Sequence, residues 1–267
     1  MSENLDAVDR DKAIVQWRQL VNLLRQCGAE VRELDCSDPR IPDVTFIANA
    51  GSFIRLHPTY PYSFITSKFR YDERTPEEAF FVDQMEWAGA NVFPPKEIFE
   101  GDGDLLRIGS MIIVGNGFRT STEFIERLER SKIPALQIKL VDPRFYHLDT
   151  CFFWHRAPWT DFSSPPNDIC WYYPKAFSMP SLRALRQHLH ENDIVAYEVS
   201  ESEAKTFCCN AVGVNTHIVG DTFSKKLKKY ITERGFEVHE TSLSEFKKAG
   251  GSAKCLTLRV PRSALFK

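Results

Sequence analysis

The fold prediction begins from the stretch Lys248-Ala-Gly-Gly-Ser-Ala-Lys-Cys-Leu-Thr-Leu258, close to the C-terminus. It follows a short predicted helix at residues 243–247. It leads into a predicted strand at residues 256–260, where apolar and β-branched residues alternate. Gly250 and Gly251 end the helix, because glycine adopts positive φ angles without steric cost. We therefore expect a compact turn that presents Cys255 at the start of a strand, with Lys254 favouring its thiolate form. The alternative is a buried structural cysteine.

The composition is that of an ordinary soluble globular protein. The chain has 267 residues, of which 43% are hydrophobic and 26% charged. This length predicts one catalytic domain over residues 1–267, with residues 1–10 as a flexible N-terminal tail. The formal net charge of −2 gives no reason to expect nucleic acid or an anionic membrane as a partner.

The ends and the cysteines predict a cytoplasmic protein. The N-terminus is short and acidic, unlike a signal peptide, and no run approaches the ~18 apolar residues of a membrane helix. The seven cysteines are odd in number and irregularly spaced, which indicates reduced thiols in a cytosolic protein.

The first fifty residues predict one helix and two strands. Residues 11–27 place five apolar side chains on one helical face, and Gly28 ends the helix. These are Ile14, Trp17, Leu20, Val21 and Leu24. Residues 30–34 alternate as a strand does, and residues 44–54 resemble a strand that is interrupted by a small polar patch around Asn49. A turn residue capping its own backbone is the simpler interpretation of Asn49.

Two arginines precede a well-marked helix. Thr75 and Glu78 form a capping box around a proline, which predicts a helix from there to residue 88. Arg70 and Arg74 lie in the charged loop before it. Such arginines are usually solvated, but they can also grip a carboxylate with their forked guanidinium groups.

An acidic loop, Glu100-Gly-Asp-Gly-Asp104, leads into further predicted strands. It predicts either an exposed turn or a carboxylate held near a cation or an imidazole, and the remaining ligands of a calcium loop are missing. After a strand at residues 111–114, Arg119 stands just before a helix that Thr120 and Glu123 cap and that runs to residue 131.

A histidine and an aspartate follow the predicted strand at residues 135–140. His147 and Asp149 are two residues apart, so in an extended chain they share one face and one pocket. A structural histidine is the alternative. His147, Cys151 and His155 match no zinc spacing, and we expect no metal and no cofactor. Residues 157–168 form a loop rich in proline and serine, which favours a lid or an insertion.

The C-terminal half repeats one pattern of elements. It predicts strands at 194–198, 211–215, 217–220 and 236–239, a capped helix from Ser200 and a basic helix near 224–234. Strand, strand, helix, strand thus recurs in units of roughly fifty residues without a shared motif. No Gly-x-Gly-x-x-Gly follows the first strand, which excludes a Rossmann domain. The sequence therefore predicts one α/β domain built from quasi-repeated modules.

Five stretches together resemble the guanidino-group-modifying superfamily, which includes arginine deiminase, dimethylarginine dimethylaminohydrolase and the amidinotransferases. They are Pro42-Asp43-(x)2-Phe46-(x)2-Asn49, Glu100-Gly-(x)-Gly-Asp104, Gly117-Phe-Arg-Thr120, His147-Leu-Asp-Thr150 and Gly250-Gly-(x)3-Cys255. Each motif is weak alone, but all five occur in the family's order. The resemblance covers most of the chain, from about residue 41 to residue 260.

The resemblance implies the pentein fold, an α/β-propeller of five ββαβ-type modules with pseudo-fivefold symmetry and an active site in the central hole. It implies a catalytic cysteine, histidine and carboxylate at Cys255, His147 and Glu100. The remaining positions that it implies contact the substrate: Asn49, Asp149, Arg119, Arg70, Arg74, Asp102 and Asp104. A thiolate would attack the guanidinium carbon, and the histidine would transfer the protons.

Two departures from the family pattern affect these roles. The acidic loop is one residue longer than the usual Glu-Gly-Gly-Asp, so Glu100 or Asp102 could orient the histidine; we favour Glu100. Asn49 occupies the place of an aspartate in deiminases and dimethylargininases, and with the Cys255 stretch this resembles the arginine dihydrolase branch. A carboxamide can donate and accept, so Asn49 could hold a neutral ureido intermediate for a second attack.

The resemblance implies hydrolysis of arginine or a substituted arginine, of the dihydrolase type or of the deiminase and dimethylargininase type. An amidinotransferase that uses an amine acceptor is one alternative, and a non-catalytic arginine-sensing module is another. The expected partner is a small guanidino compound. A homo-oligomer is compatible with the sequence.

Overall fold

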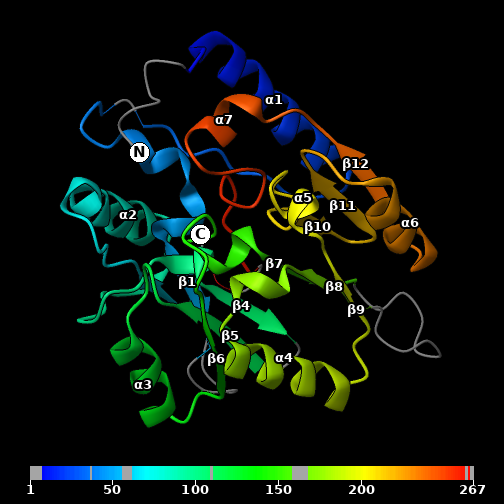
Figure 1. The fold of residues 1–267 in the computed structure, drawn as a ribbon. Helices are drawn as coiled ribbons and strands as arrows, with labels where there is room; N and C mark the ends of the chain where they lie inside the picture. Colours follow the sequence, from blue (N-terminus) through cyan, green and yellow to red (C-terminus); the bar gives the residue numbers. More distant parts are fainter. Residues whose placement is uncertain are drawn as a thin grey trace. The chain divides into compact units, whose positions relative to one another are not determined.

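The computed structural model describes residues 8–36, 38–55, 62–108, 111–157, 168–261 and 264 (Figure 1). The chain divides into two compact units. Unit 1 comprises Met1–Leu34, Thr150–Pro174 and Leu185–Lys254, and unit 2 comprises Asp35–Asp149, Lys175–Ala184 and Cys255–Lys267. The expectation of one domain over the whole chain stays a prediction.

The described strands form four three-stranded sheets with one shared topology. In each sheet the first two strands are antiparallel and the third is parallel to the second. Unit 2 holds β1 (Gly51–Ile54), β2 (Ser63–Thr66), β3 (Asn91–Phe93), β4 (Leu105–Ile108), β5 (Met111–Asn116) and β6 (Ala135–Lys139). Unit 1 holds β7 (Phe152–Arg156), β8 (Asp168–Tyr172), β9 (Ala196–Glu198), β10 (Val212–Val214), β11 (His217–Gly220) and β12 (Glu237–Glu240).

A helix joins the second strand of each sheet to the third, because a parallel pair needs a crossover connection. The crossover helices are α2 (Thr75–Trp87), α3 (Thr122–Arg130), α4 (Met179–Glu191) and α6 (Lys225–Glu233); α5 (Glu201–Ala204) is a further short helix. The predicted repeat of strand, strand, helix and strand is confirmed in these four modules. None of the described helices combines the length and the apolar character that a membrane crossing requires.

Packed aromatic side chains form the core of unit 2. Phe99 stacks on Phe124 of α3 with ring centroids 4.0 Å apart, among buried residues of β4 and β5. A second cluster packs Phe53 and Phe64 of β1 and β2 against Phe81 of α2. Together these clusters fix the starts of β1 and β4, where the polar motifs lie.

In unit 1 the N-terminal helix pairs with a helix from the other end of the chain. Helices α1 (Arg10–Gln26) and α7 (Ser244–Lys248) lie side by side (Figure 1). The amide group of Gln16 donates to the Ser244 hydroxyl at 2.9 Å and accepts from the Glu245 backbone N–H at 3.0 Å. Gln16 is therefore a buried polar residue with its hydrogen bonds satisfied, a role that the apolar pattern of the helix does not reveal. Of the apolar face predicted for α1, Ile14 is 48% exposed.

Three predicted strand segments are wrong or shortened. Residues 30–34 and 256–260 are turns or irregular segments and not strands. The segment 44–54 is mostly two 3₁₀ turns, η2 (Pro42–Thr45) and η3 (Ile47–Ala50), and only Gly51–Ile54 is a strand. A segment of alternating apolar and polar residues forms a strand only where a neighbouring strand can hydrogen-bond with it. That neighbour comes from a distant part of the chain.

The predicted helix caps give a mixed result. Helix α2 is confirmed but begins at Thr75 with no side-chain cap, because the Glu78 carboxylate accepts the Phe69 backbone N–H at 2.8 Å instead. Helix α3 also lacks a side-chain cap and begins at Thr122. The capped helix predicted from Ser200 is confirmed as α5, where Ser200 and Glu203 form a capping box.

Two further expectations fall largely outside the description. Residues 158–167 of the expected lid and residues 1–7 of the expected tail lie outside the described residues. Asp9 and Arg10 belong to the start of α1, where the Asp9 side chain accepts the Lys12 backbone N–H.

Candidate active site

Three short turns in unit 2 carry most of the predicted site, and each comes directly before the first strand of a module. Asn49 lies in η3, before β1. Glu100 precedes η5 (Gly101–Gly103) and β4, and His147 precedes η6 (Leu148–Thr150) and β7. Cys255, in the same unit, comes after α7. The side chains at these positions are buried, and their exposure is at most 5%.

Cys255 faces a carboxylate. Its Sγ lies 3.6 Å from Oδ2 of Asp149, and its backbone carbonyl accepts the Ala48 N–H at 3.1 Å. The cysteine is thus held in a turn, whereas the sequence predicted the start of a strand. His147 directly precedes the 3₁₀ turn η6 and Asp149 lies within it, so the two do not share one face of an extended chain, yet both are buried.

Glu100 connects the histidine to two arginines. Its Oε2 lies 2.8 Å from His147 Nε2 and 3.1 Å from the Arg119 Nη1 that donates to it, and its Oε1 accepts the Arg70 backbone N–H at 3.1 Å. Burial opposes ionisation, but hydrogen bonding to His147 and the nearby positive charges prevail and lower the pKa of Glu100 to about 2. Of the two acids left open by the sequence, Glu100 is the one bonded to the imidazole; Asp102 is half-buried.

Arg119 is packed between two aromatic rings. Its guanidinium carbon lies 4.7 Å from the ring centroid of Tyr71 and 4.6 Å from that of Tyr146. Burial, supported by the neighbouring Cys255, raises the pKa of Tyr146 above its usual value. The exposed Arg70 side chain donates from Nε to the Arg119 carbonyl at 2.8 Å. These contacts orient the Arg119 guanidinium toward Glu100.

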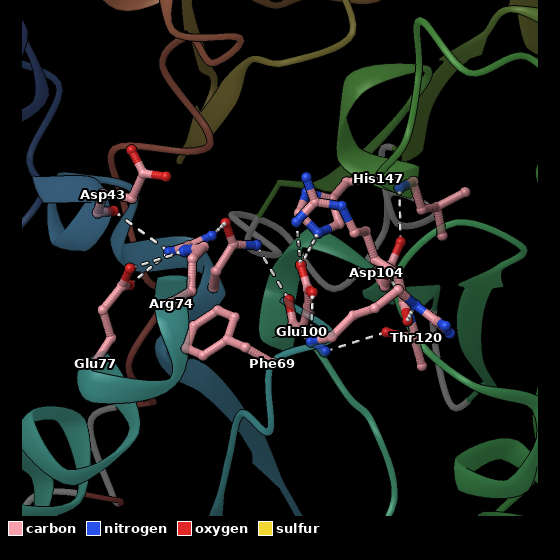
Figure 2. Close-up of polar contacts among 12 residues, drawn as sticks. Asp43, Phe69, Arg74, Glu77, Glu100, Asp104, Thr120 and His147 are labelled. Carbon is pink, nitrogen blue, oxygen red and sulfur yellow. Dashed lines mark hydrogen bonds and ion pairs between the residues drawn. The ribbon is translucent and has the colours of Figure 1, made fainter. Parts of the chain in front are cut away.

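Arg74 differs from the solvated arginine that the loop predicted. It is 7% exposed, and it donates from Nε and Nη2 to the two carboxylate oxygens of Glu77 at 2.8 and 2.6 Å (Figure 2). Its Nη1 donates to Asn49 Oδ1 at 3.0 Å, and its Nη2 lies 3.3 Å from the Asp43 carbonyl. The forked guanidinium thus binds groups of the protein itself.

Asn49 is held at both ends of its amide group. Oδ1 accepts from Arg74, and Nδ2 donates to the Glu100 backbone carbonyl at 3.1 Å. Gly103 leaves the room for this arrangement, since a Cβ at that position would lie 2.4 Å from Asn49 Nδ2 and 3.2 Å from His147 Cγ. Asn49 and His147 therefore approach the same point of the acidic loop.

Asp104 joins two loops of the site. Its Oδ1 accepts the Leu148 backbone N–H at 3.0 Å, and its Oδ2 accepts the Thr120 N–H at 3.1 Å (Figure 2). Complete burial raises the pKa of this carboxyl. These bonds position η6 and the segment of Arg119, while a direct contact of Asp104 with substrate stays a prediction.

The sequence reasoning missed four supporting residues. Glu77 holds Arg74, Tyr71 and Tyr146 enclose Arg119, and Thr120 Oγ1 accepts the Glu100 N–H at 3.1 Å. The spacing Arg-Thr-Pro-Glu77 is a usable signal, because residues three apart meet on a helix. The sequence carries no comparable signal for Tyr71.

The chain matches the family model described as eukaryotic N,N-dimethylarginine dimethylhydrolase over residues 2–262. It is 36% identical over 265 residues to a bifunctional arginine dihydrolase/ornithine cyclodeaminase from Nostoc, covering 97% of this chain and 35% of that protein. It is 32% identical over 256 residues to a dimethylarginine dimethylaminohydrolase from Mycobacterium tuberculosis, covering 95% of this chain and 77% of the relative. The chain spans about a third of the length of the bifunctional relatives it matches.

A solved structure of similar fold supports the same relationship. It is a variant of the N-terminal domain of ArgZ, the bifunctional enzyme of Synechocystis, covalently bound to a reaction intermediate. The TM-score is 0.81 at 34% identity, covering 97% of this chain and 90% of that one. The chain therefore belongs to the N,N-dimethylarginine dimethylhydrolase family, within the guanidino-modifying superfamily that its five motifs predict.

Proposed function

We propose that the chain is a cysteine-dependent hydrolase of the guanidino group of arginine or a substituted arginine, acting through a covalent thiouronium intermediate. The observation that carries this proposal is the pair of buried contacts, Cys255 with Asp149 and His147 with Glu100, in one unit. Relatives named as arginine dihydrolases and as a dimethylarginine dimethylaminohydrolase support it. The reaction needs a nucleophile, a proton carrier and carboxylates, and these residues supply each of them.

The pentein arrangement is part of the same proposal. The four ββαβ modules would be joined by a fifth, built from the chain ends, around a pseudo-fivefold axis with the site in the central hole. The repeated topology of the four sheets and the similarity to ArgZ support this arrangement.

The positive charge of the substrate's guanidinium favours the thiolate form of Cys255. Before substrate binds, the Cys255 thiol donates to the Asp149 carboxylate, and a thiolate there would face a second negative charge. A guanidinium that binds Asp149 through its N–H groups neutralises this carboxylate and places positive charge beside the sulfur. Binding thus favours loss of the thiol proton at the moment when the thiolate is needed.

The first hydrolysis then follows in two steps. Cys255 passes its thiol proton to His147, and the thiolate attacks the guanidinium carbon. The tetrahedral adduct then breaks its C–N bond as His147 gives this proton to the departing amine. A water molecule adds to the thiouronium carbon while His147 accepts a proton from it. The C–S bond breaks and the sulfur takes this proton back from His147, which frees citrulline and returns the thiol.

The second hydrolysis of a dihydrolase uses the neutral ureido group of citrulline. Hydrolysis breaks the two C–N bonds of this group and gives ornithine, carbon dioxide and ammonia. An aspartate would hold a neutral ureido group poorly, whereas the Asn49 amide both donates and accepts. Because Arg74 and the Glu100 carbonyl hold Asn49, the amide presents a fixed orientation to this intermediate.

The substrate's α-carboxylate is assigned to two arginines. Arg70 is exposed, and Arg119 lies beside it with its guanidinium already oriented. Both can bind a carboxylate in bidentate fashion. Arg74 is engaged with Glu77, so we assign it to positioning Asn49 instead.

Product analysis tests the proposal. Arginine and its methylated derivatives are each incubated with the chain, and ammonia, methylamines, citrulline and ornithine are measured. We expect ammonia and ornithine from arginine with no amine acceptor added. Ornithine formed without ammonia, and only when an amine acceptor is present, would indicate an amidinotransferase, and saturable binding without any product would indicate a sensing module.

The Asn49→Asp variant tests the second step. We expect it to release citrulline and almost no ornithine, because a carboxylate replaces the group that holds the ureido intermediate. Asn49→Gln is the matched control for a change of size without charge. Unchanged ornithine release by Asn49→Asp would defeat the role given to this residue.

A further inference from the structure

Unit 1 contains a second cluster of reactive side chains that the proposed reaction does not use. The sulfur of Cys27 and one ring nitrogen from each of His217 and His239 lie within 4.8 Å of one another. Glu237 adds a carboxylate oxygen 3.4 Å from His217 Nδ1 and 3.8 Å from His239 Nε2. Thiolate, imidazole and carboxylate are the ligands of a divalent transition metal.

We propose that Cys27, His217, His239 and Glu237 form a binding site for a divalent transition metal ion of zinc type. The mixed set of sulfur and nitrogen donors favours zinc over magnesium or calcium, which take oxygen ligands. All four residues belong to unit 1, whereas Cys255 and His147 belong to unit 2.

The sheet places three of the four ligands. β11 and β12 are parallel neighbours, with His217 opposite Glu237 and Val219 opposite His239. Residues two apart on a strand point to the same side, so Glu237 and His239 share one face. His217 reaches that face from the adjacent strand. The pairing register of β11 and β12 is therefore enough to place two imidazoles and one carboxylate together.

The fourth ligand comes from the end of α1 and is fixed there. Cys27 is the C-cap of α1, and its carbonyl accepts the Asn215 side-chain N–H at 3.0 Å. Gly28 follows with φ +91°, and a Cβ there would lie 2.9 Å from Asn215 Nδ2. This contact ties the helix end to the β10–β11 turn. The C-terminal end of a helix also favours a cation.

The distances suit a tetrahedral ion. With zinc–nitrogen bonds of about 2.0–2.1 Å, two imidazole nitrogens lie about 3.3 Å apart. His217 Nδ1 and His239 Nε2 are 3.0 Å apart, and the Glu237 distances of 3.4 and 3.8 Å are close to the same value. Cys27 is 3% exposed and both histidines are partly buried, whereas the Glu237 side chain is 69% exposed, so the ion would be open to water on the Glu237 side only. The alternative is a metal-free pair in which one neutral imidazole donates to the other.

Cobalt(II) is the probe, because a thiolate ligand gives a near-ultraviolet charge-transfer band and a tetrahedral site gives intense visible bands. The protein is the tag-free chain of residues 1–267 with Cys255→Ser, which removes the thiol of the proposed active site. We expect one cobalt per chain with both kinds of band, and zinc should displace the cobalt.

Three ligand variants and one control are made in that same background. Cys27→Ala should abolish the charge-transfer band. His217→Gln and His239→Gln should weaken binding by about tenfold or more, in line with the loss of groups that hold a metal. The two histidines are only half-buried, so these variants keep the test valid if Cys27→Ala fails to fold. His190→Gln, at an exposed histidine, should bind as the parent does.

Three outcomes would overturn the site. They are a stoichiometry well below one, a charge-transfer band that survives Cys27→Ala, and equal affinity of His239→Gln and His190→Gln. Each outcome would favour the metal-free histidine pair. None depends on hydrolytic activity, so the site and the proposed function can fail separately.

Discussion

At the scale of single residues, one glycine sets the geometry of the proposed site. Gly103 lies where the side chains of Asn49 and His147 approach the acidic loop, and no larger residue fits without displacing one of them. A protein interior is packed densely enough that such a displacement is felt by the whole group. Gly103 thus couples the residue proposed for the second hydrolysis to the proposed proton carrier.

Gly103→Ala should lower kcat/KM for arginine by about tenfold or more, since a misplacement of about 1 Å can cost ~100-fold in rate. The measurement is steady-state kinetics together with a urea unfolding curve. Gly213→Ala is the control, because its Cβ would meet the ring of His155 in unit 1, whereas Gly103, Asn49 and His147 belong to unit 2. Equal losses of kcat/KM in both variants would mean that overpacking alone accounts for the effect.

At the scale of elements, the acidic loop acts as the connection between modules of unit 2. Glu100 bonds to His147, Arg119 and the backbone of Arg70, and Asp104 bonds to the backbones of Leu148 and Thr120. A buried carboxylate of this kind is costly unless each of its oxygens is satisfied. The loop therefore holds η6 and the start of α3 in register.

Glu100→Gln should reduce the free energy of unfolding by about 3 kcal/mol at pH 7, because it leaves buried positive charge without its partner. The pKa of Glu100 is lowered from 4.5 to about 2. Its contribution is therefore complete above the unfolded-state pKa and is lost as the pH falls toward 2.

Urea unfolding of the chain and of Glu100→Gln should thus differ strongly at pH 7 and progressively less on acidification below about pH 4. Glu129→Gln, at an exposed glutamate, is the control and should differ little from the parent at any pH. A difference for Glu100→Gln that is constant from neutral to acid would contradict the proposed ionised network.

At the scale of the molecule, the two compact units are built from alternating pieces of the chain. The chain passes from unit 1 to unit 2 after Leu34, returns after Asp149, and crosses again after Pro174, Ala184 and Lys254. Neither unit could be separated by a single cut. The expected single catalytic domain is consistent with this interleaved order.

Calorimetry should accordingly show one unfolding transition, with equal calorimetric and van 't Hoff enthalpies. The reason is that the loss of either unit leaves the other made of disconnected segments. Two resolved transitions would show that the units unfold independently, and the single-domain prediction would then be wrong.

How much the sequence predicts depends on whether the deciding contact is local. The repeat of strand, strand, helix and strand follows from local periodicity and is confirmed in four modules. The strand predicted after Cys255 is wrong, because residues 253–256 form a turn and residues 257–260 are irregular. The Thr75 capping box is also wrong, since Glu78 bonds to Phe69, which no local rule anticipates.

In the candidate site, too, the sequence predicts what local motifs decide and does not predict what distant contacts decide. The order of the motifs predicts Cys255, His147 and Glu100 as one group, and all three belong to unit 2. The environment of Arg74 could not be predicted, because burial against Glu77 and Asn49 depends on the packing of η3 and α2. The cluster of Cys27, His217 and His239 could not be predicted for a related reason: its members are far apart in sequence and match no zinc spacing.

The central claim is that the Cys255 sulfur forms a covalent bond to the guanidino carbon of the substrate. Acid-quenched mixtures of the chain with arginine, digested and examined by mass spectrometry, test this most directly. We predict an adduct with the mass of arginine minus ammonia on the peptide that contains Cys255. It should be present in mixtures quenched during turnover and be absent in Cys255→Ser. Full turnover by Cys255→Ser, or an adduct on any other residue, would contradict the account.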